Sequence, residues 1–73
     1  MLLSNLNPQT KVKLVTINND DLRLQLLKIG LQKGNQFTIE HRISGGPALL
    51  KYKSQEIAIG KNYLDLIEVE KVA

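Results

Sequence analysis

The 73-residue chain is long enough for one small domain, residues 1–73, and it holds no cysteine, which excludes disulfide cross-links and thiolate metal sites. Its hydrophobic fraction of 42% is sufficient for a core, but no run of about 18 apolar residues is present to span a membrane. The formal net charge of +3 comes from cations that are scattered along the chain, which is typical of a solvated surface and not of a nucleic-acid-binding patch.

The chain opens with MLLSNLNP, which is short and lacks the basic start of a secretory signal, so we expect a soluble cytoplasmic protein without membrane insertion. The next segment, KVKLVTI at residues 11 to 17, is rich in β-branched side chains and predicts a first strand. Alternation along this strand is expected to place Val12, Leu14 and Thr16 on one face and Ile17 on the other.

A short helix is predicted after this strand. The polar run NNDD at residues 18 to 21 suits a helix start, because Asn and Asp side chains accept hydrogen bonds from the free N–H groups of the first turn. Leu22, Leu26 and Ile29 follow at helical spacing and predict one apolar stripe facing the core. Gly30 is then expected to end the helix in the left-handed conformation.

The other residues of this helix and of its exit have distinct expected roles. Leu24 projects away from the stripe and is expected to be exposed, whereas Leu27 widens the stripe and is expected to lie in the core. Lys28 is expected in the last turn, where a cation complements the helix dipole. Leu31 is expected to enter the core, and Gly34 to turn the chain into the next strand.

The second half of the chain predicts four strands and one helical turn, which are, in order, strands at 36 to 42, 48 to 53 and 56 to 60, the turn at 61 to 66, and a strand at 67 to 72. Phe37 and Ile39 are expected to face the core from the first of these strands. SGGP at residues 44 to 47 predicts a loop, and the next two strands form a hairpin joined at Ser54 and Gln55.

Five short strands in so small a chain can bury a common face by curling, which also removes most exposed strand edges. The sequence therefore predicts a mainly β fold: a small SH3-like barrel of about five strands, with one short α-helix after the first strand and a helical turn before the last.

The residue types that usually carry catalysis do not occur in suitable patterns. His41 has no cysteine beside it, and its neighbour Glu40 projects to the opposite face of the strand. Glu68 and Glu70 share a strand face and are expected to be solvated. No glycine-rich phosphate loop is present. We therefore predict no catalytic residue, no cofactor and no metal site, and do not expect an enzyme.

Several segments in order resemble one known family. LLKIGLQKG at residues 26 to 34 resembles the L-L-x-L-G-L-x-P-G motif of the FeoA family, with Lys33 in place of its proline. ISGGPALLKY is similar to the family's P-L-G-D-P loop and following strand, and EIAIGKNYLDLIEV resembles its closing segment. The resemblance covers about residues 6 to 70.

The resemblance implies an SH3-like barrel that acts as a cytosolic accessory of bacterial ferrous iron uptake. The implied partner is the cytosolic G-protein domain of the FeoB-type membrane iron transporter, with no nucleic acid expected. Two alternatives are a small barrel that binds nucleic acid and an interaction domain related to iron-dependent transcriptional regulators.

The candidate protein-interaction surface combines the helix, its exit and the loop at residues 43 to 47. Exposed apolar side chains with cations around them are typical of an interface core. The residues of this surface are Arg23, Leu24, Leu27, Lys28, Lys33, Gly45, Gly46 and Pro47.

Overall fold

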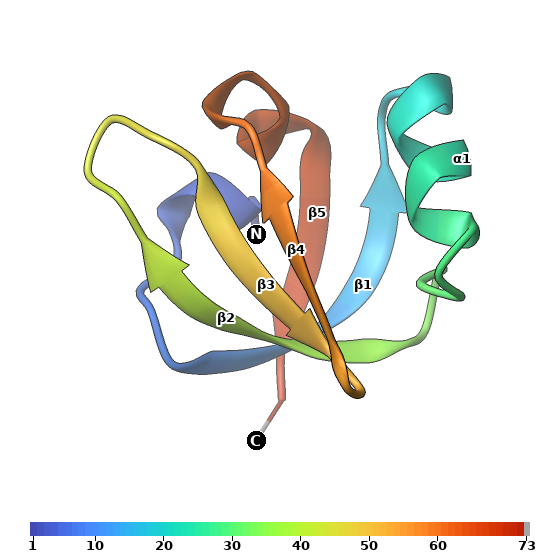
Figure 1. The fold of residues 1–73 in the computed structure, drawn as a ribbon, viewed down its shortest axis with the longest axis horizontal. Coiled ribbons are helices and arrows are strands. Elements are labelled where there is room, and N and C mark those ends of the chain that lie inside the picture. The colour runs from blue at the N-terminus through green and yellow to red at the C-terminus, as the bar shows by residue number, and fades with distance from the viewer. Residues whose placement is uncertain (73) are drawn as a thin grey trace.

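The computed structural model describes residues 1–72 (Figure 1). Two 3-10 helices are present in this part of the chain, η1 (Leu3–Asn5) and η2 (Lys61–Leu66), and one α-helix, α1 (Asp20–Leu27). The five strands are β1 (Thr10–Ile17), β2 (Gln36–Arg42), β3 (Ala48–Tyr52), β4 (Gln55–Ile59) and β5 (Ile67–Lys71). The predicted order of strands, helix and helical turn is confirmed, and η1 is an addition that the sequence did not predict.

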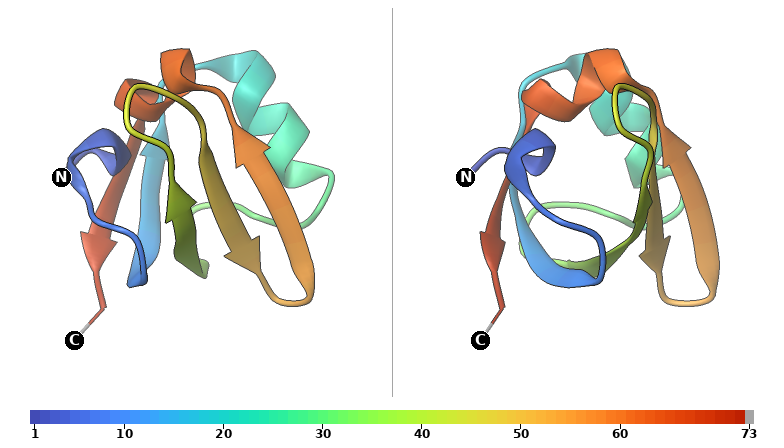
Figure 2. Two further views of the ribbon diagram at one scale, coloured as in Figure 1. Left: turned by 60° about the vertical axis from the view of Figure 1, so that its left-hand side comes forward. Right: turned by 90° about the vertical axis from the view of Figure 1, so that its left-hand side faces the viewer.

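The strands form one antiparallel sheet with the order β4-β3-β2-β1-β5. This sheet curls around a single core into a small SH3-like barrel, which confirms the predicted fold class (Figure 2). Val12, Leu50 and Val69 lie at its centre with no exposed surface, and Phe37, Ile39 and Leu31 are also buried, as predicted. No helix in residues 1–72 is long and apolar enough to cross a membrane.

A β-bulge changes the expected alternation of β1. Its register with β5 shifts between Leu14 and Thr16, so one extra residue is accommodated there. Beyond the bulge Thr16 is exposed and Ile17 is buried, which makes the predicted orientation of these two side chains wrong. The bulge reverses the phase of the strand, and this allows Ile17 to reach the core.

The hairpin between β3 and β4 turns one residue earlier than predicted. Tyr52 pairs directly with Gln55, so the connecting residues are Lys53 and Ser54, not Ser54 and Gln55. Lys53 adopts a positive φ of 56°. A two-residue hairpin needs such a conformation because its turn must follow the right-handed twist of the strands.

Arg42 attaches the N-terminal segment to β2. Its Nη1 donates hydrogen bonds to the carbonyl oxygens of Ser4 at 2.6 Å and Leu6 at 3.4 Å. Leu3 and Leu6 are buried in the same core as the strands. The segment before β1 is therefore part of the fold.

Candidate protein-interaction site

Helix α1 begins where the sequence predicts it, on an Asn side chain. The Oδ1 atom of Asn19 accepts a hydrogen bond from the backbone N–H of Leu22 at 2.8 Å, which satisfies one of the free donors of the first turn. Asp20 and Asp21 follow in that turn, where negative charge is favourable. Leu22 and Leu26 then bury their side chains, so the cap and the stripe together set how α1 lies against the barrel.

The exit of α1 is a tight reversal at Gly30. The N–H of Gly30 donates to the carbonyl of Leu27 at 2.9 Å, and the N–H of Leu31 donates to that of Leu26 at 3.0 Å. These two bonds are the pattern of a Schellman motif, which needs a left-handed residue at the position of Gly30. Its φ is +87°, so its predicted role is confirmed. The Tyr52 hydroxyl donates to the Gly30 carbonyl at 3.2 Å and ties this exit to β3.

A second turn leads from this exit into β2. The N–H of Asn35 donates to the carbonyl of Gln32 at 3.0 Å, and Gly34 between them has a φ of +91°. The N–H of Gly34 donates to the carbonyl of Leu14 on β1 at 2.9 Å. Gly34 therefore turns the chain into the strand as predicted, and its backbone hydrogen bond to Leu14 holds the turn against β1.

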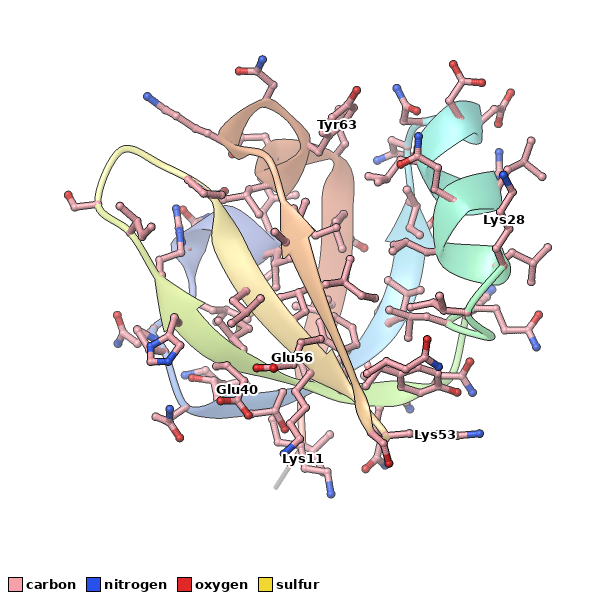
Figure 3. The ribbon with its side chains drawn as sticks, in the orientation of Figure 1. Lys11, Lys28, Glu40, Lys53, Glu56 and Tyr63 are labelled. Atoms are coloured by element: carbon pink, nitrogen blue, oxygen red, sulfur yellow. The ribbon has the colours of Figure 1, made fainter. Side chains whose placement is uncertain are left out.

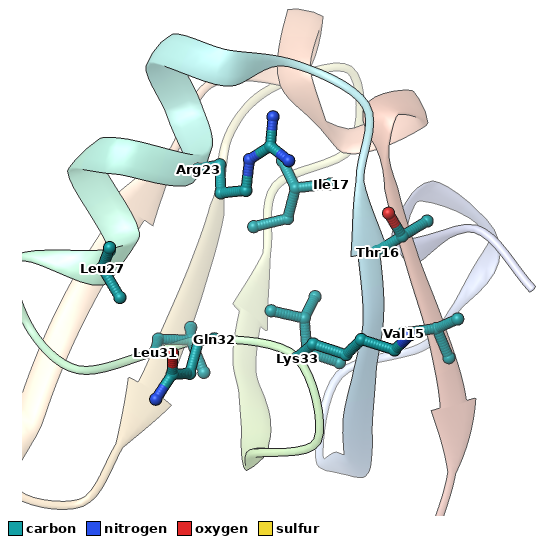
Figure 4. A pocket seen from close by; sticks show the side chains of 9 residues that line it. Val15, Thr16, Ile17, Arg23, Leu27, Leu31, Gln32 and Lys33 are labelled. Atoms are coloured by element: carbon teal, nitrogen blue, oxygen red, sulfur yellow. The ribbon is translucent and has the colours of Figure 1, made fainter.

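A cleft of about 260 Å³ lies between α1, the upper half of β1 and this second turn (Figure 4). Its floor is apolar, with Leu14, Ile17 and Leu31. Its full lining is Leu14, Val15, Thr16, Ile17, Arg23, Leu27, Leu31, Gln32 and Lys33. Both the bulge of β1 and the reversal at Gly30 contribute to it, so the cleft depends on tertiary structure.

The charges on the lining of this cleft have one sign. Arg23 and Lys33 line it, and no carboxylate does. Arg23 forms an ion pair with Asp20 one turn earlier in α1.

Elsewhere in the described chain Lys13 pairs with Glu70 at 3.6 Å and Lys51 lies 3.9 Å from Glu40, so part of the positive charge on the sheet is balanced by neighbouring carboxylates.

Leu24 and Leu27 both present apolar surface on α1. Leu24 is 58% exposed, as predicted. Leu27 is 46% exposed and lines the cleft, so its predicted place in the core is wrong. Leu22 and Leu26 are the buried residues of α1, and Leu27 lines the cleft beside them. Lys28 lies directly after the last residue of α1 instead of within its last turn, because the helix ends at Leu27 (Figure 3).

The loop part of the predicted surface lies apart from the cleft. Gly45, Gly46 and Pro47 connect β2 to β3, at the upper left of Figure 1, whereas α1 lies at the right. Pro47 lines a second, mainly apolar groove of about 440 Å³ that shares no residue with the cleft. Its lining is His41, Arg42, Ile43, Pro47, Ala48, Leu49 and Ala58. The structure thus divides the predicted surface into two.

Sequence reasoning did not identify most of this groove. Ile43 is the most exposed large apolar side chain in the described chain, at 61%. Leu49 and Ala58 face it from β3 and β4, and they were assigned only as strand residues. Ile43 lies within the predicted 43–47 loop, whereas the approach of Leu49 and Ala58 to it depends on how β3 and β4 pair.

His41 lies on the outer side of β2 and lines this second groove. Within residues 1–72, no three His, Asp or Glu side chains gather in a group that could hold a metal ion.

Comparison with known proteins identifies the family to which the chain belongs. The family model of the FeoA domain matches residues 1–71. None of the curated proteins compared with the chain matches it.

Three solved structures share the fold. The FeoA protein from Chlorobium tepidum aligns with a TM-score of 0.89 and 20% identity, over 100% of this chain and 71% of that chain. A protein named iron uptake regulatory protein (FeoA) aligns with a TM-score of 0.84 and 26% sequence identity, over 99% of this chain and 96% of that chain. Iron(II) transport protein A from Clostridium thermocellum aligns with a TM-score of 0.83 and 30% sequence identity, over 99% of this chain and 46% of that chain.

Proposed function

This chain belongs to the FeoA domain family, which is associated with ferrous iron transport, and from that premise we propose that it is a non-enzymatic accessory protein of bacterial ferrous iron uptake. It acts in the cytoplasm by docking on the cytosolic G-protein domain of an FeoB-type membrane transporter. The docking surface is the cleft beside α1, together with the exposed leucines of that helix.

The observation that carries this proposal is an apolar cleft with a cationic lining next to exposed leucines. Leu27 is half exposed at the cleft, and Leu24 adds a second apolar side chain on α1. Such an arrangement suits a partner segment that brings apolar side chains and carboxylates, because apolar contact provides affinity and opposite charge provides orientation. Lys33 and Arg23, which already pairs with Asp20, are the cations of the lining that those carboxylates would meet.

The direct test measures binding between this protein and the purified cytosolic domain of the transporter, by calorimetry. Leu27→Asp is expected to weaken binding by about 2 kcal/mol or more, since it places a charge where an apolar anchor enters the cleft. Leu24→Asp is expected to weaken binding by about 1 kcal/mol. Both side chains are exposed, so both variants should keep the fold.

Ile43→Asp is the matched control, because it places the same charge on another exposed apolar side chain, at the other groove. It is expected to leave binding unchanged. Absence of binding by the unmodified protein would contradict the proposed function, and equal losses in all three variants would contradict the proposed surface.

A further inference from the structure

Strand β1 has a neighbouring strand on both sides only along its first half. On one side it pairs with β2 as far as Lys13, and Leu14 then makes the last backbone bonds, to the turn that precedes β2. On the other side it stays paired with β5 as far as Ile17. Residues 15–17 therefore have a strand on one side and the cleft beside α1 on the other (Figure 4).

The pairing with β5 shows which way the backbone of Ile17 points. The N–H of Asn18 donates to the carbonyl of Leu66, just before β5, at 2.7 Å. Because a trans peptide holds its C=O opposite its N–H, the carbonyl of Ile17 points away from β5, to the cleft. Bonded and non-bonded positions alternate along an antiparallel ladder, so the N–H of Ile17 also points to the cleft. Within residues 1–72, no backbone group of a loop, turn or cap bonds to either of them.

These two backbone groups restrict what can fill the cleft. Ile17 is 4% exposed and lies in the floor of the cleft, so an occupant would shut water out from its backbone. Buried backbone N–H and C=O groups are nearly always hydrogen-bonded. A helix bonds its own backbone groups to one another along its length and would leave those of Ile17 unpaired. An extended segment offers them a free C=O and N–H, as a peptide does when it adds a strand to a sheet.

The cations of the lining add a second restriction. In Figure 4, Arg23 lies towards one end of residues 15–17 and Lys33 towards the other. Lys33 makes no ion pair within residues 1–72. The ion pair of Arg23 with Asp20 is exposed to solvent, so water screens it and a second carboxylate can share the guanidinium. Leu27 provides apolar surface on the α1 side of the same cleft.

We propose that the cleft binds one extended segment of the partner, which adds a short strand to β1 at Ile17 and carries an apolar residue with a carboxylate on each side. This inference rests on the proposed function, because it names the part of the partner that occupies the same cleft. The segment lies alongside β1 where β2, which begins at Gln36, does not reach. Its backbone pairs with the N–H and C=O of Ile17, and its apolar side chain contacts Leu27. Its carboxylates meet Arg23 and Lys33.

Amide hydrogen exchange of this protein, alone and with the purified cytosolic domain of the transporter, tests the backbone pairing. In the free protein Ile17 should exchange faster than Leu14 and Asn18, because those two amides are already bonded. On binding, exchange at Ile17 should slow about tenfold more than at either neighbour, since only its bond is made in the complex alone. Binding without this extra protection would overturn the inference and leave the proposed function standing.

Calorimetry with charge variants tests the chemistry of the segment. Lys33→Glu should weaken binding about tenfold, because it sets a carboxylate against a carboxylate of the partner. Lys11→Glu is the matched control, because it makes the same change in net charge at the exposed lower end of β1, away from the cleft (Figure 3). It should weaken binding less than about threefold, since salt screens distant charges. Equal losses in the two variants would contradict the acidic segment.

Nuclear Overhauser effects between the two proteins in the complex identify the shape of the bound segment. We expect contacts between the amide proton of Ile17 and the backbone protons of an extended stretch of the partner. A helical segment in the cleft would overturn this inference alone. Absence of any binding would contradict the proposed function, and this inference with it.

Discussion

At the scale of single residues, two glycines shape the cleft by backbone conformation. Gly30 and Gly34 have φ values of +87° and +91°, which side chains with a Cβ rarely adopt. A Cβ on Gly34 would meet no atom within 4 Å, so the requirement for glycine there is conformational and not a matter of space. Lys33 precedes it at the second position of the turn closed by Gln32 and Asn35.

Replacing Lys33 by proline is expected to stabilise the protein by about 0.4–1 kcal/mol, because proline suits the second position of such a turn and restricts the unfolded chain. Gly34→Ala, next in the chain, should destabilise by about 1 kcal/mol because it must hold a positive φ. Urea unfolding of both variants, with Lys33→Ala as the reference for the lost charge, measures the two effects. Destabilisation by Lys33→Pro would show that the turn does not have the expected geometry.

At the scale of elements, the cleft depends on where α1 starts and on the bulge in β1. The Asn19 side chain fixes the first turn of a helix that is only eight residues long, and so short a helix is marginal without capping and packing. The bulge at the middle of β1 then presents Ile17 inward, below Arg23 in the cleft.

Asn19→Ala is expected to lower the free energy of unfolding by about 1 kcal/mol, since it removes the acceptor for the N–H of Leu22. Asn19→Asp should keep most of the stability, because its carboxylate can accept the same bond. Thermal unfolding followed by circular dichroism measures the change. Asn18→Ala is the matched control one residue earlier, because the bond of Asn18 to Leu66 is made by the backbone. An equal loss in both alanine variants would argue against a specific cap.

At the scale of the whole molecule, one core lies beneath both the cleft and the second groove. The chain has no disulfide to supplement it, and small domains bury a modest fraction of their surface. Stability is therefore expected to be low in absolute terms, about 4–11 kcal/mol from typical values per residue. Ile17 and Leu31, which line the cleft, and Ala48, which lines the second groove, all belong to this core.

Leu50→Ala is expected to remove about 2–5 kcal/mol of this stability, because Leu50 is fully buried at the centre and its truncation leaves a cavity. Leu24→Ala changes the same residue type at an exposed position and should cost less than about 0.5 kcal/mol. Denaturant titration of both variants provides the comparison. Similar midpoints for the two would contradict the arrangement of the core.

The order of the elements and the fold class follow from the sequence, because alternation in strands, the leucine stripe of α1 and the turn glycines are local patterns that report burial directly. The exposure of Leu24 and the roles of Gly30, Leu31 and Gly34 followed from the same patterns. The inward position of Ile17, the exposure of Leu27 and the separation of the 44–47 loop from the helix became apparent only from the three-dimensional arrangement. Each depends on how distant segments meet: a bulge shifts register against another strand, and a helix buries only the side that its neighbour covers.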